Sequence, residues 1–559
     1  MRVSPLWFAA ALALAVACRG KEAPAPVATA SLPEVSAPAG LVAELSLGNP
    51  KETWSRLLRA GGSFAQALPS SLPVLLATSL SLPPAAAGTL DESVPFVGAV
   101  LSQAGSSEPD LVLGVHVTSG PELVASLTLG DAAKFRRVEL APRVVRLVSA
   151  PGAPELDGAL GVSGNYLLVA SRVDALRDAG RFVAESVPKR ARSEPGFTLS
   201  TSQGVVGGAL SRRLRDLWQS RRAALAERAR AERQAKGRPA DFADPEALLA
   251  GADGVVDSWL AVLDSSKALS LNLSPEVDRF RAELALTPGA AGAAALLSKD
   301  LAVGSIAPLL ALPQKTSAAL LLRGDAAGHP GEPSTLADSL TKLFGARLNP
   351  EQATKMTNAL GNFGQAHHGA SVVALVPLPA PSMLLTFETR DAEAFSRSLG
   401  DVISLVQLPP VSGWLAGVWG KPQLVLAAKP TQGVYRARVR FQRGAAARSA
   451  LPPALSLSWQ AKDGVGQLLI SADEATGFAA LTELPRLEQA SWFGSAELGQ
   501  GEHTAAALVA DARLLAAGTD DAPLLASFGK KGEQIVVTLD VATAALPALA
   551  RVFALDRSP

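Results

Sequence analysis

Cysteine is nearly absent from this chain of 559 residues, in which Cys18 is the only one. A single thiol cannot close a disulfide within the chain, so stability has to come from the burial of apolar side chains. Hydrophobic residues make up 48% of the sequence, which is enough to supply such a core. Because Cys18 lies in the N-terminal export segment described below, no cysteine is left to act as a catalytic nucleophile.

Histidine is also scarce, and the five that occur match no spacing of metal ligands such as HExxH. They are His116, His329, His367, His368 and His503. The one adjacent pair, His367 and His368, follows Gly364 in an expected loop, where we interpret it as a solvated turn. The sequence therefore predicts no metal site.

Motifs for nucleotide and acyl chemistry are missing as well. The glycine-rich stretch from Gly204 to Gly208 lacks the Lys-Ser/Thr ending of a phosphate-binding loop, and the sequence has no GxSxG nucleophile elbow. Adjacent carboxylates such as Asp473 and Glu474 fall at turns or helix starts, where capping accounts for them. We therefore expect a protein that is not an enzyme and that needs no cofactor.

The N-terminus carries an apolar run, Leu6 to Val16, of about 11 residues, which is shorter than the roughly 20 that a spanning helix needs. With Arg2 before it, this run is typical of a signal peptide. Residues 14–18, Leu-Ala-Val-Ala-Cys, resemble the lipobox of bacterial lipoproteins. The resemblance implies cleavage after Ala17 and a lipid on Cys18, which would anchor the protein in the membrane.

One departure from this lipoprotein pattern matters. Ala15 stands where the family usually has leucine, and residues 15–17 also fit ordinary signal cleavage, which leaves a plain secreted protein as the alternative. Arg19 follows the cysteine where inner-membrane retention signals usually have Asp. The resemblance therefore implies an outer-membrane location, facing the periplasm or the cell surface.

The folded part contains two stretches that follow the same pattern, from Asp110 to Leu127 and from Pro381 to Leu399. In each, an apolar run of strand length precedes a helix that should begin at Ser119 or Asp391, both N-cap residue types. A second matched pair lies at residues 164–170 and 464–470. We therefore predict an α+β fold of two related strand-helix domains with mostly antiparallel sheets, with Leu123 and Phe395 in equivalent core positions. Large uncharacterised bacterial extracytoplasmic proteins are similar in this pattern, and they offer no catalytic motif to transfer.

The expected organisation has six ranges. They are a signal peptide (1–17), a lipid-anchored Ala/Pro-rich tether (18–40), a first α+β repeat (41–200), a basic helical hairpin (201–266), strands with a connecting helix (267–316), and a second α+β repeat with a C-terminal strand and helix (317–559).

Charge is nearly balanced over the whole chain, at +1, but it is unevenly distributed. The segment from Ser211 to Arg238 contains ten Lys or Arg residues and three acidic ones, which gives it a local net charge of +7. The helix expected from Val205 to Lys236 should pack inward through its apolar side and leave its far half exposed. The inward residues are Leu210, Leu214, Leu217 and Trp218, and the exposed cations are Arg228, Arg230, Arg233 and Lys236.

Two interpretations of this basic helix remain open. It is either a solvated helix face or a contact for an anionic partner, namely lipid head groups, polysaccharide or an acidic protein. Nucleic acid is excluded by the export signal. We therefore expect a non-enzymatic envelope lipoprotein that acts as a binding or scaffolding module. The alternative is a carrier of an apolar ligand such as a lipid, which an apolar cavity open to solvent would favour.

Overall fold

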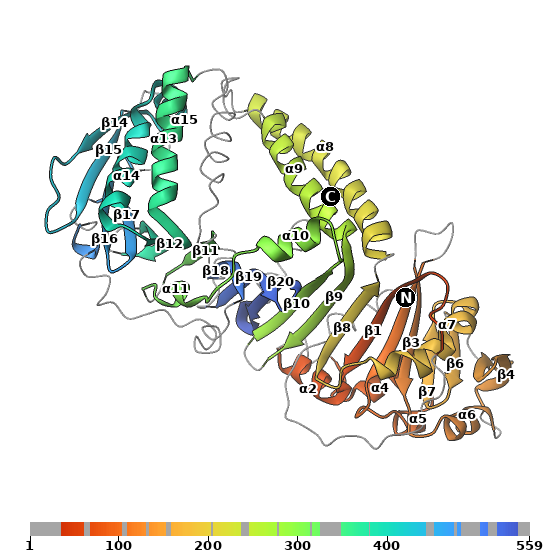
Figure 1. Ribbon diagram of the computed structural model, residues 1–559. Helices are drawn as coiled ribbons and strands as arrows, with labels where there is room; N and C mark the ends of the chain where they lie inside the picture. Colours follow the sequence, from red (N-terminus) through yellow and green to blue (C-terminus); the bar gives the residue numbers. More distant parts are fainter. Residues whose placement is uncertain are drawn as a thin grey trace. The chain divides into compact units, whose positions relative to one another are not determined.

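The computed structural model describes most of the chain. The described residues are 35–60, 68–102, 109–129, 133–151, 158–202, 205–235, 245–276, 279–313, 316–324, 348–378, 381–442, 452–473, 478–481, 503–511 and 522–545. The predictions for Cys18 and for Lys236 fall outside them. The chain forms two compact units: unit 1 is Met1–Arg212, Leu263–Ala290 and Val536–Leu546, and unit 2 is Arg213–Val262, Ala291–Ile535 and Pro547–Pro559 (Figure 1).

Unit 1 is built on an antiparallel sheet. Its strands are β1 (Leu41–Gly48), β2 (Phe96–Leu101), β3 (Asp110–His116), β4 (Phe135–Ala141), β5 (Val144–Ser149), β6 (Ala159–Ser163), β7 (Tyr166–Ala170), β8 (Gly196–Ser202), β9 (Ser266–Pro275), β10 (Arg279–Pro288) and most of β20 (Gln534–Ala542). Its helices are α2 (Pro50–Ala60), α4 (Leu72–Ser79), α5 (Pro84–Ala87), α6 (Gly120–Thr128) and α7 (Val173–Glu185), with the short helical turns η1 (Val187–Lys189), η2 (Val205–Leu210) and η7 (Thr543–Ala545).

Neighbouring strands in this sheet follow the order β10-β9-β8-β1-β2-β3-β7-β6-β5-β4. Helices cover both faces. Leu76 and Leu123, from α4 and α6, pack on one face, and Leu176 and Phe182, from α7, pack on the other. Figure 1 shows α2, α4, α5 and α6 along one side of the sheet. The α7 layer was not predicted from the sequence.

The turn from β3 into α6 has the expected local chemistry. The Ser119 side chain accepts a hydrogen bond from the Glu122 backbone N–H, which confirms Ser119 as the N-cap. Gly120 follows at a point where a Cβ atom would collide with the Gly164 carbonyl oxygen, so the close approach of these two chain segments requires glycine. Leu123 is then fully buried in the core of unit 1.

Unit 1 is completed by strands from distant parts of the sequence. β9 pairs with β8, and β20 pairs with β10. Asp540 of β20 is buried and accepts a hydrogen bond from Arg281 Nε at 2.8 Å, with buried Arg279 beside it. This division differs from the expected ranges, which placed residues 267–316 in a separate segment and the last strand in the second repeat. The expected ranges differ because the pairing of strands from distant parts of the chain determines which unit a strand joins, and no local sequence pattern shows that pairing.

Unit 2 contains a second antiparallel sheet. Its strands are β11 (Ala318–Arg323), β12 (His367–Pro377), β13 (Pro381–Thr389), β14 (Lys421–Leu426), β15 (Tyr435–Gln442), β16 (Ala454–Lys462), β17 (Val465–Ser471), β18 (Thr504–Asp511) and β19 (Pro523–Lys531). Its helical elements are α8 (Ser211–Ala235), α9 (Pro245–Asp264), α10 (Ala293–Asp300), α11 (Ala307–Leu310), α13 (Pro350–Ala366), α14 (Ala392–Ser404), η4 (Leu405–Gln407) and α15 (Pro409–Val418).

The strand order in unit 2 is β19-β18-β11-β12-β13-β17-β16-β15-β14. Leu309 of α11 packs with Leu321 on one face of this sheet. Phe395 of α14 packs with Trp459 and Leu468 on the other face. Since helices pack on antiparallel sheets in each unit, the predicted α+β class is confirmed.

The expected turn at His367 and His368 is wrong. These residues begin β12, where both are half-buried. His367 Nδ1 lies 2.6 Å from the Phe363 carbonyl oxygen, and its ring contacts those of Phe363 and Phe387. The helix α13 runs through Gly364 and ends at Ala366, so the strand starts directly after it without an intervening loop.

Candidate functional site

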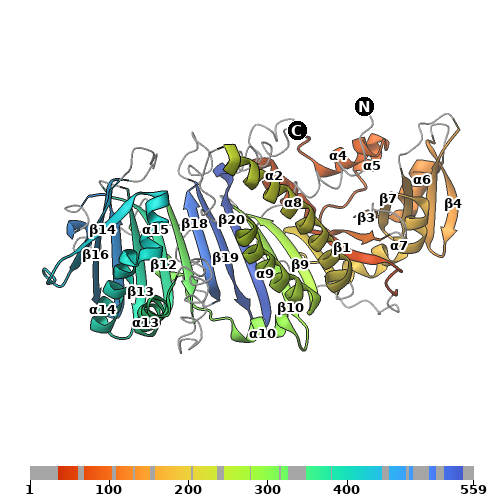
Figure 2. The ribbon, with the colours of Figure 1, turned by 90° about the horizontal axis from the view of Figure 1, so that it is seen from above.

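The basic segment forms a helical hairpin of α8 and α9, which lie side by side in both ribbon views (Figures 1 and 2). Asp253 of α9 joins the two helices, because its carboxylate accepts hydrogen bonds from Trp218 Nε1 at 2.9 Å and from Arg222 Nε at 2.9 Å. These two donors hold the pKa of Asp253 below its ordinary range, so the carboxylate stays ionised at neutral pH. The expected helical hairpin is therefore present among the described residues.

The expected packing of α8 on its return helix holds for Trp218, which bonds to Asp253, and is wrong for the leucines. Leu214, Leu217 and Leu225 are 38%, 55% and 46% exposed, although their spacing predicted an inward face. The buried residues of α8 are instead Ser211 and Ala226. Both lie near the side of the helix from which Arg222 bonds to Asp253. Helical periodicity identified an apolar stripe correctly, but it could not tell whether the fold covers that stripe.

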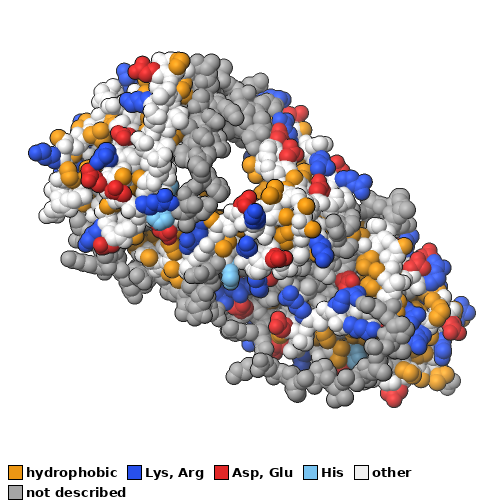
Figure 3. All heavy atoms as spheres, viewed as in Figure 1, with side chains coloured by type: hydrophobic (Ala, Val, Ile, Leu, Met, Phe, Trp, Pro, Cys, Tyr) orange, Lys and Arg blue, Asp and Glu red, His pale blue; other side chains and the backbone are white. Residues whose placement is uncertain are grey.

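The sequence predicted that the cations in the far half of α8 are exposed, and two of the four have described side chains. Arg228 and Arg230 are exposed. Arg233 is in the last turns of α8, but its side chain is outside the described residues, as is all of Lys236. Figure 3 shows basic side chains along the hairpin with acidic ones among them.

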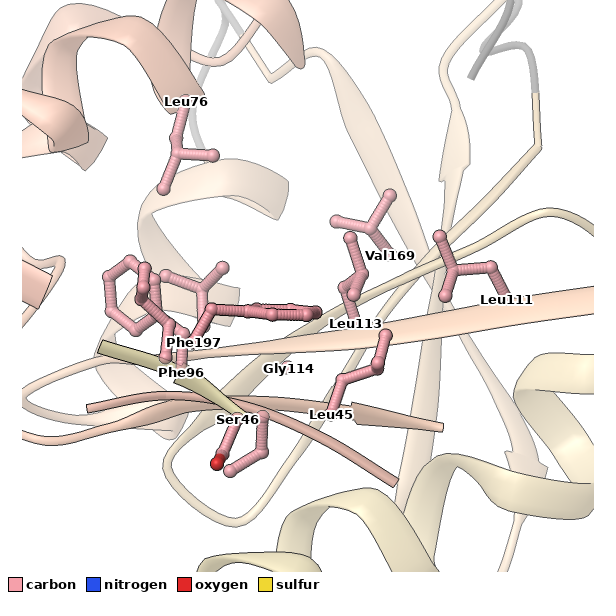
Figure 4. Close-up of a pocket in the computed structure, with 12 residues that line it drawn as sticks. Leu45, Ser46, Leu76, Phe96, Leu111, Leu113, Gly114, Val169 and Phe197 are labelled. Atoms are coloured by element: carbon pink, nitrogen blue, oxygen red, sulfur yellow. The ribbon is translucent and has the colours of Figure 1, made fainter. Parts of the chain in front are cut away.

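Unit 1 offers a different kind of site, an apolar pocket of about 60 Å³. Its wall is the sheet face between β8 and β7, and Leu76 of α4 lies across from that face (Figure 4). The lining residues are Leu45, Ser46, Leu47, Leu76, Phe96, Val97, Leu111, Leu113, Gly114, Val115, Val169 and Phe197. Apart from Ser46 these offer only hydrocarbon and backbone, so the pocket suits an apolar group and provides no catalytic one.

The titratable pairs elsewhere in unit 1 tie chain segments together. His116 Nδ1 lies 3.1 Å from Asp91 Oδ2, and the Ser93 hydroxyl donates to Asp91 at 2.6 Å. Burial alone would raise the pKa of Asp91, but the bonds from Ser93 and the nearby His116 lower it overall. Burial raises the pKa of the neighbouring Tyr166 to about 12, so this phenol stays protonated. Ser93 and His116 both contact the carboxylate and not each other, which is not the order of a catalytic triad.

In the described part of the chain, no group of three or more His, Cys, Asp or Glu residues is arranged to hold a metal ion. None of the described helices combines the length and the apolar character needed to cross a membrane.

Comparisons with known proteins give little. No protein-family model matches the chain, and no curated protein matches it. Among solved structures, the chain is similar to "Structure of crystal form III of TP0453" with 10% identity and a TM-score of 0.22, covering 44% of this chain and 97% of that one. "Structure of crystal form I of TP0453" gives 10% identity and a TM-score of 0.21, covering 44% and 98%. Similarity at this level supports no conclusion about fold or function.

Proposed function

We propose that this chain is a non-enzymatic lipoprotein of the cell envelope that binds an anionic partner through α8. The observation that carries the proposal is the far half of α8, where Arg228 and Arg230 remain exposed. Exposed cations on a helix with a net charge of +7 between Ser211 and Arg238 attract anionic surfaces, namely lipid head groups, polysaccharide or an acidic protein. We assign no cofactor and no nucleic-acid partner.

Attachment to the membrane is the second part of the proposal. The lipobox-like residues 14–18 support a lipid on Cys18, and the Ala/Pro-rich stretch up to residue 40 supports an extended tether. Such a tether would hold the protein near the bilayer, facing the periplasm or the cell surface. Arg19, in place of the Asp that is usual in inner-membrane retention signals, supports the outer membrane as that bilayer. α8 would then act at high effective concentration toward any anionic group of that surface.

We also propose that the two sheets descend from one duplicated domain. The support is their order of pairing: β8-β1-β2-β3-β7-β6-β5-β4 in unit 1 has the same succession as β18-β11-β12-β13-β17-β16-β15-β14 in unit 2. Leu123 and Phe395, in the helices after β3 and β13, are both fully buried.

Replacing Arg228, Arg230, Arg233 and Lys236 together by Gln should abolish binding to anionic partners. The expected change in melting temperature is small, because exposed charges contribute about 0 to 1 kcal/mol each to stability. Binding of the wild type should weaken with salt, since the Debye length falls from about 10 Å at 0.1 M to about 3 Å at 1 M. Co-sedimentation with anionic vesicles and with envelope polysaccharide measures both effects.

A matched control removes the same number of charges from unit 1. Lys134, Arg136, Arg137 and Arg143 are exposed, and replacing all four by Gln should leave binding unchanged. Equal loss in both variants would mean that only net charge matters. Undiminished binding of the α8 variant, or none by the wild type, would leave α8 as a solvated helix face.

The alternative function is that of a carrier of an apolar ligand, and the pocket of unit 1 is the observation that favours it. Its volume of about 60 Å³ is less than half of the roughly 150 Å³ cavity that holds benzene in an engineered lysozyme. An acyl chain would therefore enter only if α4 moved away from the sheet. Leu76 is the α4 residue that such a movement would displace.

The carrier function predicts binding of a fluorescent fatty acid that is lost when the pocket is filled. Val169→Phe places a larger side chain in the pocket lining and should abolish that binding. The same substitution at Val74, which is 46% exposed on α4, should have no effect. Probe binding that is equal in both variants would exclude this pocket as the carrier site.

A further inference from the structure

We propose that the α8-α9 hairpin docks on the surface of an anionic lipid bilayer, with α8 lying in the plane of the interface and its leucine stripe inserted. The proposal rests on the anionic contact assigned to α8 above and names its partner. We define the leucine stripe as Leu214, Leu217 and Leu225.

The leucine stripe forms a continuous line along α8. Leu217 and Leu225 follow Leu214 by three and eleven residues, so at about 100° per residue the three lie within about 80° of one another around the helix. All three are substantially exposed, in contrast to the buried Ser211 and Ala226, which lie about 80° and 140° around the same helix from the middle of the stripe. A helix in water gains nothing by exposing three large apolar side chains on one line, so a partner for them is expected.

The stripe side of α8 also carries basic residues. Arg221 and Arg228, both exposed, follow Leu214 by seven and fourteen residues and therefore fall within the same side as the stripe. Of the three acids of α8, Asp216 and Glu227 fall about 120 to 140° from the middle of that side, and Glu232 falls within it. Leucines accompanied by arginines, in a segment whose net charge is +7, complement a surface that is negatively charged outside and apolar just beneath.

This combination favours a bilayer over the other anionic partners. A polysaccharide offers charge but no apolar phase for the leucines. An acidic protein would need a groove shaped to a convex helix, whereas the head-group region of a bilayer adapts to one. The lipid surface is therefore the partner that accommodates both the stripe and its arginines.

The fold holds this helix in a fixed orientation. Asp253 accepts hydrogen bonds from Trp218 and Arg222, which lie about 60° and 100° around α8 from the middle of the stripe. At the base of the hairpin, the Trp259 ring of α9 packs edge-to-face against Phe528 of β19 with centroids 5.7 Å apart. Rotation of α8 would break the Asp253 bonds, so the stripe stays to one side of the contact with α9.

The test uses residues 18–559 with Cys18→Ser, so that no acyl chain contributes, and vesicles of phosphatidylcholine alone or mixed with phosphatidylglycerol. This protein, with the hairpin otherwise unchanged, should bind the mixed vesicles and should bind vesicles of pure phosphatidylcholine much more weakly. Arg221→Gln with Arg228→Gln should weaken binding by about fivefold per charge. Leu217→Glu with Leu225→Glu should weaken it by at least about tenfold, since the stripe would no longer insert.

A matched control places glutamate on an exposed leucine outside the hairpin. Leu296→Glu on α10, where the leucine is 61% exposed, should bind like the wild type. Circular dichroism should show unchanged folding for every variant, because the substituted leucines are already exposed.

The outcomes separate this proposal from the broader function. Binding to a soluble polyanion such as dextran sulfate, without binding to mixed vesicles, would keep the anionic contact and overturn the bilayer assignment. Vesicle binding that survives the Leu→Glu pair would also overturn insertion of the stripe. Binding to neither probe would contradict both proposals together.

Discussion

Replacing Phe395 by alanine should lower the free energy of unfolding of unit 2 by about 3 to 5 kcal/mol. The Phe395 ring is 0% exposed and lies with its centroid 5.5 Å from that of Phe387 and 5.6 Å from that of Phe363. Alanine would leave a cavity among these rings, and close packing around it limits relaxation. Trp459, whose Nε1–H donates to the Ser396 carbonyl oxygen at 3.0 Å, reports on the same cluster by fluorescence during urea unfolding.

A control for this prediction is Leu508→Ala on β18, because Leu508 is 47% exposed. Its loss should stay below about 1 kcal/mol, as for surface substitutions in general. If Phe395→Ala cost no more than this control, the aromatic cluster would contribute little to the stability of unit 2.

Gly466 gives a second test of the same contact. A Cβ atom at Gly466 would lie 2.5 Å from the Phe395 ring, so Gly466→Ala alone should destabilise unit 2 by about 1 to 3 kcal/mol. Phe395→Leu removes ring atoms at that point. The double variant should therefore lose less than the sum of the two single losses, which a double-mutant cycle measures.

Cys18→Ser should move the protein from the membrane fraction to the soluble fraction, or stall its processing. A lipidated cysteine holds a protein on the bilayer through its acyl chains, and serine offers no thiol for that linkage. The separation should be made at about 1 M salt, where the Debye length of about 3 Å screens any contact of the basic hairpin with lipid. Metabolic labelling with a fatty acid should mark the wild type and not the variant.

The matched control for the anchor is Ala28→Ser, which makes the same side chain within the tether and should leave labelling unchanged. An unlabelled and fully soluble wild type would support the plain secreted protein that residues 15–17 also allow. Release at high salt from Cys18→Ser, with partial retention at low salt, would separate the lipid anchor from the hairpin contact.

Local features of the fold were predictable because their physics is local. Ser119 and Asp391 cap their helices through bonds to N–H groups two or three residues away, and both were identified from residue type and spacing. The strands that precede them were recognised by apolar runs of β-forming residues. The burial of Leu123 and Phe395 followed from their position one turn into amphipathic helices.

Features that depend on distant parts of the chain were missed. His367 was placed in a loop because Gly364 suggested a break, yet the helix continues through that glycine and brings the Phe363 ring into contact with the histidine ring. The leucine stripe was assigned to the core because periodicity shows that a face is apolar, not what covers it. The side of α8 that packs is decided by Asp253, more than 30 residues later in the sequence than Trp218.

The pairing of β10 with β20 has a consequence for how this protein is made. About 245 residues separate the two strands, and a ribosome adding about 5 to 20 residues per second needs roughly 12 to 50 s to supply them. Until then the outer edge of β10 has no neighbouring strand. Arg279 and Arg281 also lack the Asp540 carboxylate that they contact in the folded protein. Unit 1 is translated first, but it cannot complete its sheet until β20 has been made. During this interval the nascent chain carries an unpaired strand edge with which other chains can pair.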